Sequence, residues 1–239
     1  MHAAAVGVVL AAGMGTRVGA DGNKAYLPLA GRSMVSWSVE AVARSTHITR
    51  TILVFRRGER DLAARTLATE LPHAAVELVE GGDTRHGSEE NVLHHLAPDI
   101  ESGAVDVVLI HDAARPLAVP AMMDTALTTA RSFGGAIPVL PVTDVARTGA
   151  DSRLLPADGT LVRVQTPQAF RARPLLAAYR SAAGGSFEGT DTASCVQNYT
   201  DVEVRAFPGA STNLKVTFAH DVRLAERLLQ DRITRHHTR

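Results

Sequence analysis

The 239-residue sequence predicts an α/β fold in which a mostly parallel sheet is flanked by helices. Short runs of apolar and β-branched residues recur along the chain, and longer segments with helical periodicity separate them. Most of these runs contain few polar residues, as is typical of parallel strands that are buried on both faces. The predicted architecture is therefore Rossmann-like, and we expect ligands to bind beyond the carboxyl ends of the strands.

The strands are predicted from five such runs, which in chain order are VGVVLA (6–11), TILVF (51–55), AVEL (75–78), DVVLIH (106–111) and GAIPVL (135–140). The segment SMVSWSVEAVARS (33–45) has the helical period and predicts the first long helix. A last helix is predicted from apolar residues at helical spacing, namely Phe218, Val222, Ala225, Leu229 and Ile233. We expect this stripe to pack against the rest of the domain.

The pattern changes at 141–165, where two short apolar pieces are separated by glycines and aspartates. This segment predicts a β-hairpin arm that projects from the sheet. An arm of this length is poorly buried by its own chain, so we expect a second subunit to cover it in a homodimer. Apart from this arm, we expect residues 1–239 to form a single domain.

Composition limits the classes of function. Lys and Arg (25) balance Asp and Glu (25), so the chain lacks the positive charge that non-specific nucleic-acid binders use. No stretch approaches the roughly 20 apolar residues of a membrane span. The single cysteine, Cys195, cannot form an intramolecular disulfide, which predicts a cytoplasmic location. A small buried side chain explains Cys195 more simply than a nucleophile does.

The glycine-rich segment VVLAAGMGTRVGADGNKAYLPLAG (8–31) predicts a site for an anion. Gly13 and Gly15 let backbone N–H groups approach a phosphate, and Arg17 and Lys24 add two positive charges. Cations in this position stabilise the charge that develops when the α-phosphorus of a nucleoside triphosphate is attacked. The glycine spacing does not fit a dinucleotide-binding turn, and a Walker loop would need Ser or Thr after the lysine.

Together with later motifs, this loop resembles that of the sugar-nucleotide and polyol-phosphate nucleotidyltransferases, and in detail that of the 2-C-methyl-D-erythritol 4-phosphate cytidylyltransferase family. The later motifs are EGGDTRHGSEENV (80–92), HDAARP (111–116), QTPQAF (165–170), TDTASCV (190–196) and NLKVT (213–217). The resemblance implies a GT-A-like nucleotidyltransferase fold. It also implies an enzyme that transfers CMP from CTP to 2-C-methyl-D-erythritol 4-phosphate, with release of pyrophosphate, in the isoprenoid precursor pathway.

The resemblance implies a role for each motif residue. Arg17 and Lys24 would stabilise the transition state, and Lys215 would position the acceptor phosphate. Contacts to the nucleotide would come from Ala11, Ala12, Gly13, Gly15, Gly82, Asp83, Ser88, Asp112 and Ala113. The acceptor would be bound by Arg115, Asp158, Thr190 and Asp191. Asp112 would also bind the cofactor Mg²⁺, which prefers oxygen ligands, with Asn213 as a possible second ligand.

Two positions depart from the family's pattern, and both belong to the acceptor side. Asp158 stands where the family has an arginine for the acceptor phosphate, and Val145 stands where a hydroxyl residue is usual. Arg153 or Arg163 could supply the missing charge. Two alternatives therefore stay open: a cytidylyltransferase for another polyol phosphate such as ribitol 5-phosphate, and a dimeric module that binds CTP without turnover.

Two smaller features have alternative interpretations. Asn23 takes the place of a proline before Lys24, and we expect it to loosen the loop. His86, Glu90 and His94 have a helical spacing that could hold a metal, although a solvated helix face explains them more simply.

Overall fold

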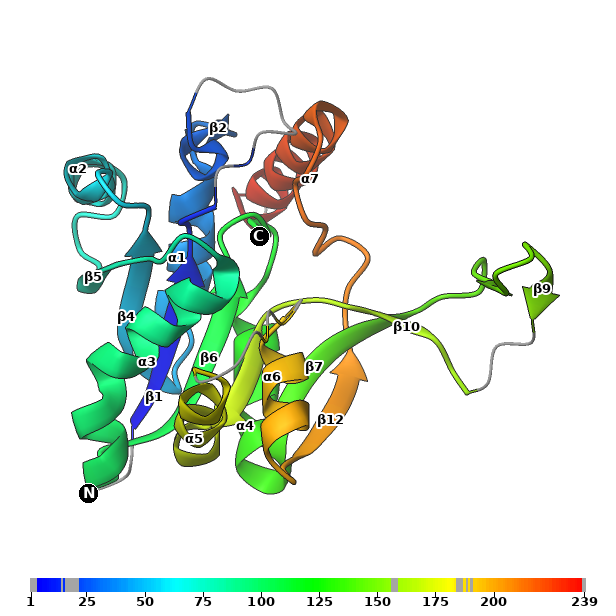
Figure 1. The fold of residues 1–239 in the computed structure, drawn as a ribbon. Coiled ribbons are helices and arrows are strands. Elements are labelled where there is room, and N and C mark those ends of the chain that lie inside the picture. The colour runs from blue at the N-terminus through cyan, green and yellow to red at the C-terminus, as the bar shows by residue number, and fades with distance from the viewer. Residues whose placement is uncertain are drawn as a thin grey trace.

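The computed structural model describes residues 4–13, 15, 22–155, 159–183, 187, 189 and 191–237. Within them, eight strands form one mixed sheet in the order β10-β7-β11-β6-β1-β4-β5, and β12 also pairs with β7 (Figure 1). The strands of this sheet are β1 (Ala4–Leu10), β4 (Ile48–Phe55), β5 (Val76–Glu80), β6 (Val105–Asp112), β7 (Gly134–Pro141), β10 (Val162–Val164), β11 (Gln168–Arg171) and β12 (Glu203–Pro208).

The central pairs of the sheet are parallel, which confirms the predicted fold class. β1 lies between β4 and β6, and β5 continues the sheet beyond β4, all in parallel register. β10 and β11 run antiparallel to their neighbours. The prediction did not include β11 or β12, which have polar residues within their short spans.

Helices cover both faces of the sheet (Figure 1). One face packs against α1 (Met34–Ala43), α2 (Arg60–Glu70) and α4 (Pro120–Phe133). The other packs against α3 (Arg85–Ser102), α5 (Ala172–Ala182) and α6 (Thr192–Tyr199). Successive residues of the central strands alternate between these two cores, as the pleat requires. Each core strand is therefore buried twice, which explains its nearly continuous apolar sequence.

Side-chain caps fix where α1 and α3 begin. The Ser33 hydroxyl accepts a hydrogen bond from Ser36 N at the start of α1, and the Thr84 hydroxyl accepts one from Gly87 N at the start of α3. A short 3-10 helix, η2 (Lys24–Tyr26), and the two-residue strands β2 (Pro28–Leu29) and β3 (Arg32–Ser33) connect β1 to α1.

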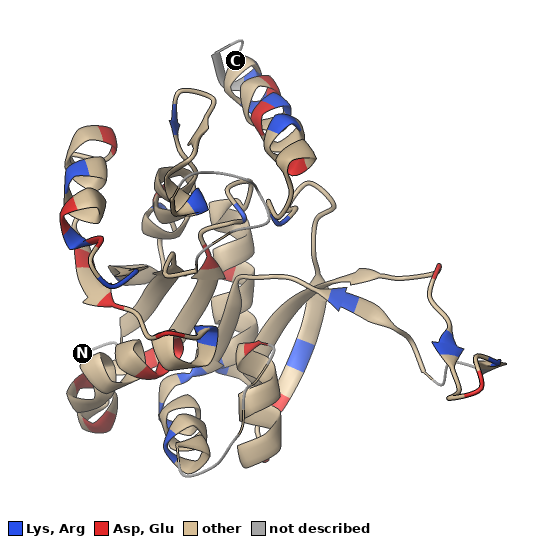
Figure 2. Ribbon diagram, turned by 45° about the horizontal axis from the view of Figure 1, so that its top comes forward, with Lys and Arg blue, Asp and Glu red and all other residues tan. Residues whose placement is uncertain are grey.

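The last helix, α7 (Ala219–His237), packs on a small separate core through Ala225 and Leu229, which are fully buried. The prediction that Phe218 belongs to the packed stripe was wrong, because Phe218 precedes the helix and is 46% exposed. Figure 2 shows that acidic and basic residues both occur along α7 and α2, in keeping with the balanced composition. None of the helices in the described ranges is long and apolar enough to cross a membrane.

The predicted arm is present and projects from the sheet, with its own small hairpin of β8 (Arg147–Thr148) and β9 (Leu154–Leu155) (Figure 1). Strand β10 then returns along β7. Several apolar side chains of the arm are exposed, and Leu154 is 75% exposed. The arm thus presents an apolar surface that this chain's own described residues do not cover.

Candidate active site

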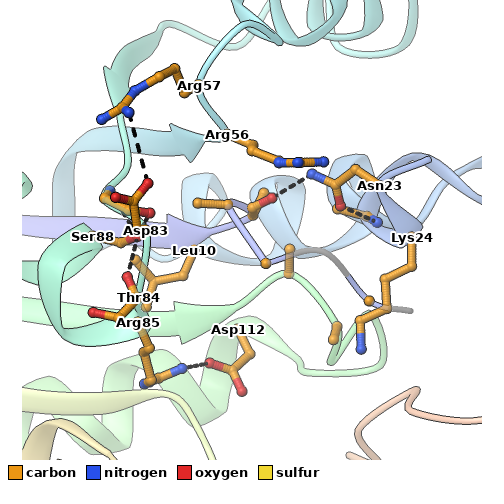
Figure 3. A pocket seen from close by; sticks show the side chains of 18 of the residues that line it. Leu10, Asn23, Lys24, Arg56, Arg57, Asp83, Thr84, Arg85, Ser88 and Asp112 are labelled. Carbon is orange, nitrogen blue, oxygen red and sulfur yellow. Dashed lines mark hydrogen bonds and ion pairs between the residues drawn. The ribbon is translucent and has the colours of Figure 1, made fainter. Parts of the chain in front are cut away.

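A cavity of about 610 Å³ lies where the parallel strands end (Figure 3). The residues that follow β1, β4, β5 and β6 all contribute to its wall, as the Rossmann-like topology predicts. Its lining residues are Leu10, Ala11, Ala12, Gly13, Gly15, Asn23, Lys24, Ala25, Arg56, Arg57, Gly82, Asp83, Thr84, Arg85, Ser88, Asp112, Ala113, Ala114 and Lys215. The structure therefore brings all the described residues that the sequence assigned to the nucleotide together in one cavity, with Lys24 and Lys215.

The end of the glycine-rich loop is held by Asn23. Its side-chain nitrogen donates to Ala11 O at 2.7 Å and to Glu59 Oε2 at 2.7 Å, and its oxygen accepts from Ala25 N at 3.0 Å. These bonds join both ends of the loop and cap η2 in front of Lys24. Asn23 is buried, and its bonds hold the described ends of this segment together. The loosening that we expect from Asn23 concerns residues 16–21, which lie outside the described residues.

The side chain of Lys24 lines the cavity and packs against Gly15. Gly15 has a φ of +62°, and a Cβ there would lie 2.4 Å from Lys24 Cγ, so only glycine leaves room for the lysine stem. Lys24 Nζ donates to Val216 O at 2.9 Å. The other predicted loop cation, Arg17, lies outside the described residues.

The segment after β5 makes a tight loop onto the start of α3. A Cβ at Gly82 would lie 2.7 Å from the carbonyl carbon of Gly87. Gly82 N donates to Ser88 Oγ at 3.2 Å, and that hydroxyl donates to Thr84 O at 2.9 Å. Asp83 is exposed, and its carboxylate lies 3.8 Å from Arg57 Nη1 (Figure 3). The backbone around Gly82 thus forms a close-fitting wall at this end of the cavity.

Asp112 lies at the carboxyl end of β6 with a cation on each oxygen. Arg85 pairs with Oδ1 (Figure 3), and Lys215 Nζ lies 2.8 Å from Oδ2. Burial alone would raise the pKa of this carboxyl, but the two cations outweigh burial and hold the pKa well below its usual range. Asp112 is therefore fully ionised at neutral pH. The side chain of Lys215 is 44% exposed, so this cation can turn toward the cavity.

His111, the preceding residue, is fully buried behind this carboxylate. Its Nε2 lies 3.2 Å from Arg115 O, and because a carbonyl only accepts, Nε2 carries the proton. The Thr166 hydroxyl then donates to Nδ1 at 3.1 Å and accepts from Asp112 N at 3.0 Å. Burial lowers the pKa of His111 to about 4, so the ring is neutral at pH 7.

Acidification is expected to destabilise the fold through His111. Between the unfolded pKa of about 6.5 and the folded value of about 4, the unfolded state binds a proton that the folded state excludes. His111 alone should therefore lower the free energy of unfolding by about 2 kcal/mol when the pH falls from 7.5 to 5. Urea unfolding at both pH values measures this change. His111→Gln, which keeps one donor and one acceptor, should lose about 2 kcal/mol less than the parent over that interval. Equal losses in both proteins would contradict the assignment.

Apart from Lys215, the described residues assigned to the acceptor lie outside the cavity wall. Arg115 is buried and donates to Asn213 O at 2.8 Å. Asp191 caps α6, accepting from Ser194 N at 3.0 Å and from Gln168 Nε2 at 3.0 Å. Asn213 is also buried, and its side chain donates to Thr166 O at 2.9 Å. Asp158 and Thr190 lie outside the described residues, and the acceptor roles remain predictions.

Sequence reasoning missed Arg85, Glu89, Arg56 and Arg57. Arg85 pairs with Asp112, and Arg56 and Arg57 line the cavity where β4 ends. Glu89 is 1% exposed. A signal for Glu89 was present, because it precedes the buried residues of α3 by helical spacing and so shares their apolar face.

Cys195 is buried, and burial together with Glu89 raises its pKa to about 12, which makes it a poor nucleophile. No group of three metal-ligating side chains occurs among the residues described.

Comparison with known proteins gives the same family along nearly the whole chain. The family model described as 2-C-methyl-D-erythritol 4-phosphate cytidylyltransferase matches residues 5–231. A relative with that name from Cereibacter sphaeroides is 40% identical over 227 residues, covering 93% of this chain and 95% of the relative. Another, from Solibacter usitatus, is 34% identical and covers 96% of this chain and 98% of the relative.

Solved structures agree. A 4-diphosphocytidyl-2C-methyl-D-erythritol synthase from Anaerococcus prevotii superposes with a TM-score of 0.81 at 25% identity, covering 95% of this chain and 96% of that chain. The 2-C-methyl-D-erythritol 4-phosphate cytidylyltransferase of Thermus thermophilus gives a TM-score of 0.71 at 27% identity, covering 96% and 100%. With the fold, the cavity and the ordered motifs in agreement, the chain belongs to the 2-C-methyl-D-erythritol 4-phosphate cytidylyltransferase family.

Proposed function

We propose that the protein transfers the cytidylyl group of CTP to 2-C-methyl-D-erythritol 4-phosphate. The products are pyrophosphate and 4-diphosphocytidyl-2-C-methyl-D-erythritol, an intermediate on the way to isoprenoid precursors. One observation carries the proposal: the Gly82 loop, Lys24, Asp112 and Lys215 line one cavity, although they lie at or after the ends of different strands of the sheet. The family match over residues 5–231 supports the same substrates.

The Gly82 loop fits a pyrimidine base. Backbone groups around Gly82 and Asp83 and the Ser88 hydroxyl can pair with the polar edge of cytosine. A loop that fits closely around a pyrimidine ring would exclude the larger ring of a purine. Ala11, Ala12 and Gly13 then offer backbone groups along the nucleotide.

The chemistry requires positioning and charge neutralisation. A phosphate monoester has its second pKa near 6, so the acceptor is already a dianion at neutral pH and needs no general base. One of its oxygens attacks the α-phosphorus of CTP, the new P–O bond forms, and the bond to the pyrophosphate oxygen breaks. Lys24 would stabilise the charge on the phosphoryl oxygens, and Lys215 would turn from Asp112 to hold the acceptor phosphate.

The donor chemistry of Asp112 fits Mg²⁺. Mg²⁺ prefers oxygen ligands and is commonly held by one or two carboxylates together with substrate phosphates. Asp112 is ionised, faces the cavity, and has lone pairs beyond those that Arg85 and Lys215 use. Asp112 and the CTP phosphates would hold the ion, which supplies further neutralisation of phosphate charge when bound.

We also propose that the protein acts as a homodimer in the cytoplasm. Val145, Leu154 and Val162 are 47%, 75% and 41% exposed on the arm, and a second copy would cover them. The cytoplasmic location is inferred from the lone Cys195.

The acceptor is the part of the proposal that the residues of this chain challenge. Asp158 carries the wrong charge for a phosphate, and Arg153, a candidate replacement, is 80% exposed and lies 3.6 Å from Asp151. These observations favour, as the second candidate, transfer to another polyol phosphate such as ribitol 5-phosphate.

The test is pyrophosphate release with CTP and Mg²⁺. Three acceptors are offered in parallel: 2-C-methyl-D-erythritol 4-phosphate, ribitol 5-phosphate and glucose 1-phosphate. Release with the first alone is expected. Release with ribitol 5-phosphate alone would replace the acceptor in the proposal, and CTP binding without release from any of the three would instead support a non-catalytic module. UTP and ATP serve as nucleotide controls.

A further inference from the structure

Glu89 is a buried acid that stands behind the cavity without lining it. It lies near the start of α3, and its carboxylate accepts hydrogen bonds from two hydroxyls on other helices. Tyr179 of α5 donates to Oε2, and Thr192 of α6 donates to Oε1 at 2.7 Å. One carboxylate thus ties together the three helices that cover this face of the sheet.

The same carboxylate reaches the cavity through Arg85. Arg85 Nε lies 3.2 Å from Glu89 Oε1, although without hydrogen-bond geometry, and Arg85 Nη1 pairs with Asp112 Oδ1. Asp112 in turn pairs with Lys215. Charges of alternating sign therefore run from the interior to the cavity, in the order Glu89, Arg85, Asp112 and Lys215.

An acid in this place depends on its partners. Burial raises the pKa of the Glu89 carboxyl, and the Arg85 charge and the two hydroxyls oppose that rise. The guanidinium of Arg85 is planar and rigid, so contacts with two carboxylates fix both its position and its orientation. Without Glu89, Arg85 would have Asp112 as its nearest acid partner and could shift with it.

Charge balance is a second reason why an acid at position 89 matters for the site. When Lys215 turns to a phosphate, the group that remains behind is Glu89, Arg85 and Asp112, with one net negative charge if both acids are ionised. Without the Glu89 charge, Arg85 would neutralise Asp112 at the moment when Asp112 has to face a magnesium nucleotide.

We propose that Glu89 is a positioning residue for the nucleotide site, which fixes Arg85 and through it the Asp112 carboxylate. This inference rests on the proposed function and deepens it, because it identifies a residue that supports the wall of the CTP site without touching the substrate.

Binding measurements test the proposal without turnover. Calorimetric titration with Mg²⁺ and a non-hydrolysable α,β-methylene analogue of CTP is carried out on the full chain. Glu89→Gln keeps the size of the side chain and removes its charge, and one of the two hydroxyls then accepts from the new amide nitrogen where it had donated. We expect it to weaken binding about tenfold, to raise the KM for CTP to the same extent, and to change kcat by less than about threefold. Asp106→Asn is the matched control, because Asp106 binds Arg131 at the start of β6, away from the cavity, and should leave the affinity unchanged.

A double-mutant cycle separates positioning from general stabilisation. Arg85→Gln should weaken binding at least as much as Glu89→Gln, and Glu89→Gln added to Arg85→Gln should cost no further affinity. Losses that multiply in the double variant, or an affinity of Glu89→Gln within twofold of the parent, would overturn the proposal.

Two further outcomes are distinguishable. If Glu89→Gln does not fold, Thr192→Val removes one anchor of Glu89 and should weaken analogue binding about threefold, whereas unchanged binding would overturn the proposal. A parent protein that does not bind the analogue would contradict the proposed function itself, and this inference with it.

Discussion

Replacing Lys24 with methionine is expected to lower kcat by about two to three orders of magnitude, because it removes a cation that is proposed to act on the transition state. Methionine keeps an unbranched stem, so the packing over Gly15 should survive and the fold should be unaffected. Stopped-flow or steady-state pyrophosphate release at saturating CTP and acceptor measures the effect.

The control for this prediction is Arg44→Gln. Arg44 is exposed at the end of α1, shortly before β4 begins, and so lies near the amino ends of the parallel strands. Its loss removes the same charge from the protein without touching the cavity. The control should keep the parent kcat. A Lys24→Met enzyme that retains a kcat within about fivefold of the parent would show that Lys24 acts mainly elsewhere than on the transition state.

Asp112→Asn is expected to lower kcat/KM by about two to three orders of magnitude and also to destabilise the protein by about 3 kcal/mol. The stability loss follows because Arg85 would be left without the carboxylate on its Nη1. Since the folded pKa of Asp112 is depressed, its contribution to stability is present above the unfolded pKa of about 3.9 and disappears as the pH falls through the folded value. The difference between parent and variant should therefore be constant from pH 8 to pH 5.

Urea unfolding and pyrophosphate release on the same samples separate the two effects. Asp106→Asn breaks an ion pair with Arg131 at the other end of β6 and should change stability with little effect on kcat/KM. If Asp112→Asn lost activity only in proportion to the unfolded fraction, the proposed place of Asp112 beside the nucleotide would be wrong.

The parts of the fold that were predictable are those that the burial of both sheet faces imposes on the sequence. The central strands have long apolar runs, so their existence could be predicted directly from the sequence. The ends of the strands were less clear. β4 begins at Ile48, three residues before the predicted run. The prediction missed this start because Thr49 and Arg50 are polar and only partly buried or exposed. β12 has Glu203 and Arg205 on an outer strand, where polar residues are tolerated, so its sequence lacked the expected signal.

The residues of the candidate site likewise divide into those that the sequence predicts and those that it does not. Residues directly after strands, such as Asp112 and the Gly82 loop, were predictable because parallel strands end at one edge. The partner of Asp112 was not, because Arg85 lies 27 residues earlier and only the packing of α3 brings the two together. The role of Asn23 also depended on a partner far along the chain, since Glu59 lies 36 residues away.

The hydrogen bond from Lys24 to Val216 joins residues that are 192 positions apart. During synthesis the first strand and its loop emerge long before the segment with Val216 and Lys215, and a ribosome adds roughly 5–20 residues per second. The nucleotide cavity must therefore stay incomplete for about ten seconds or more after its first wall has appeared. A nascent chain held before residue 213 should bind CTP poorly even when its sheet has folded, which makes nucleotide binding a late marker of maturation for this protein.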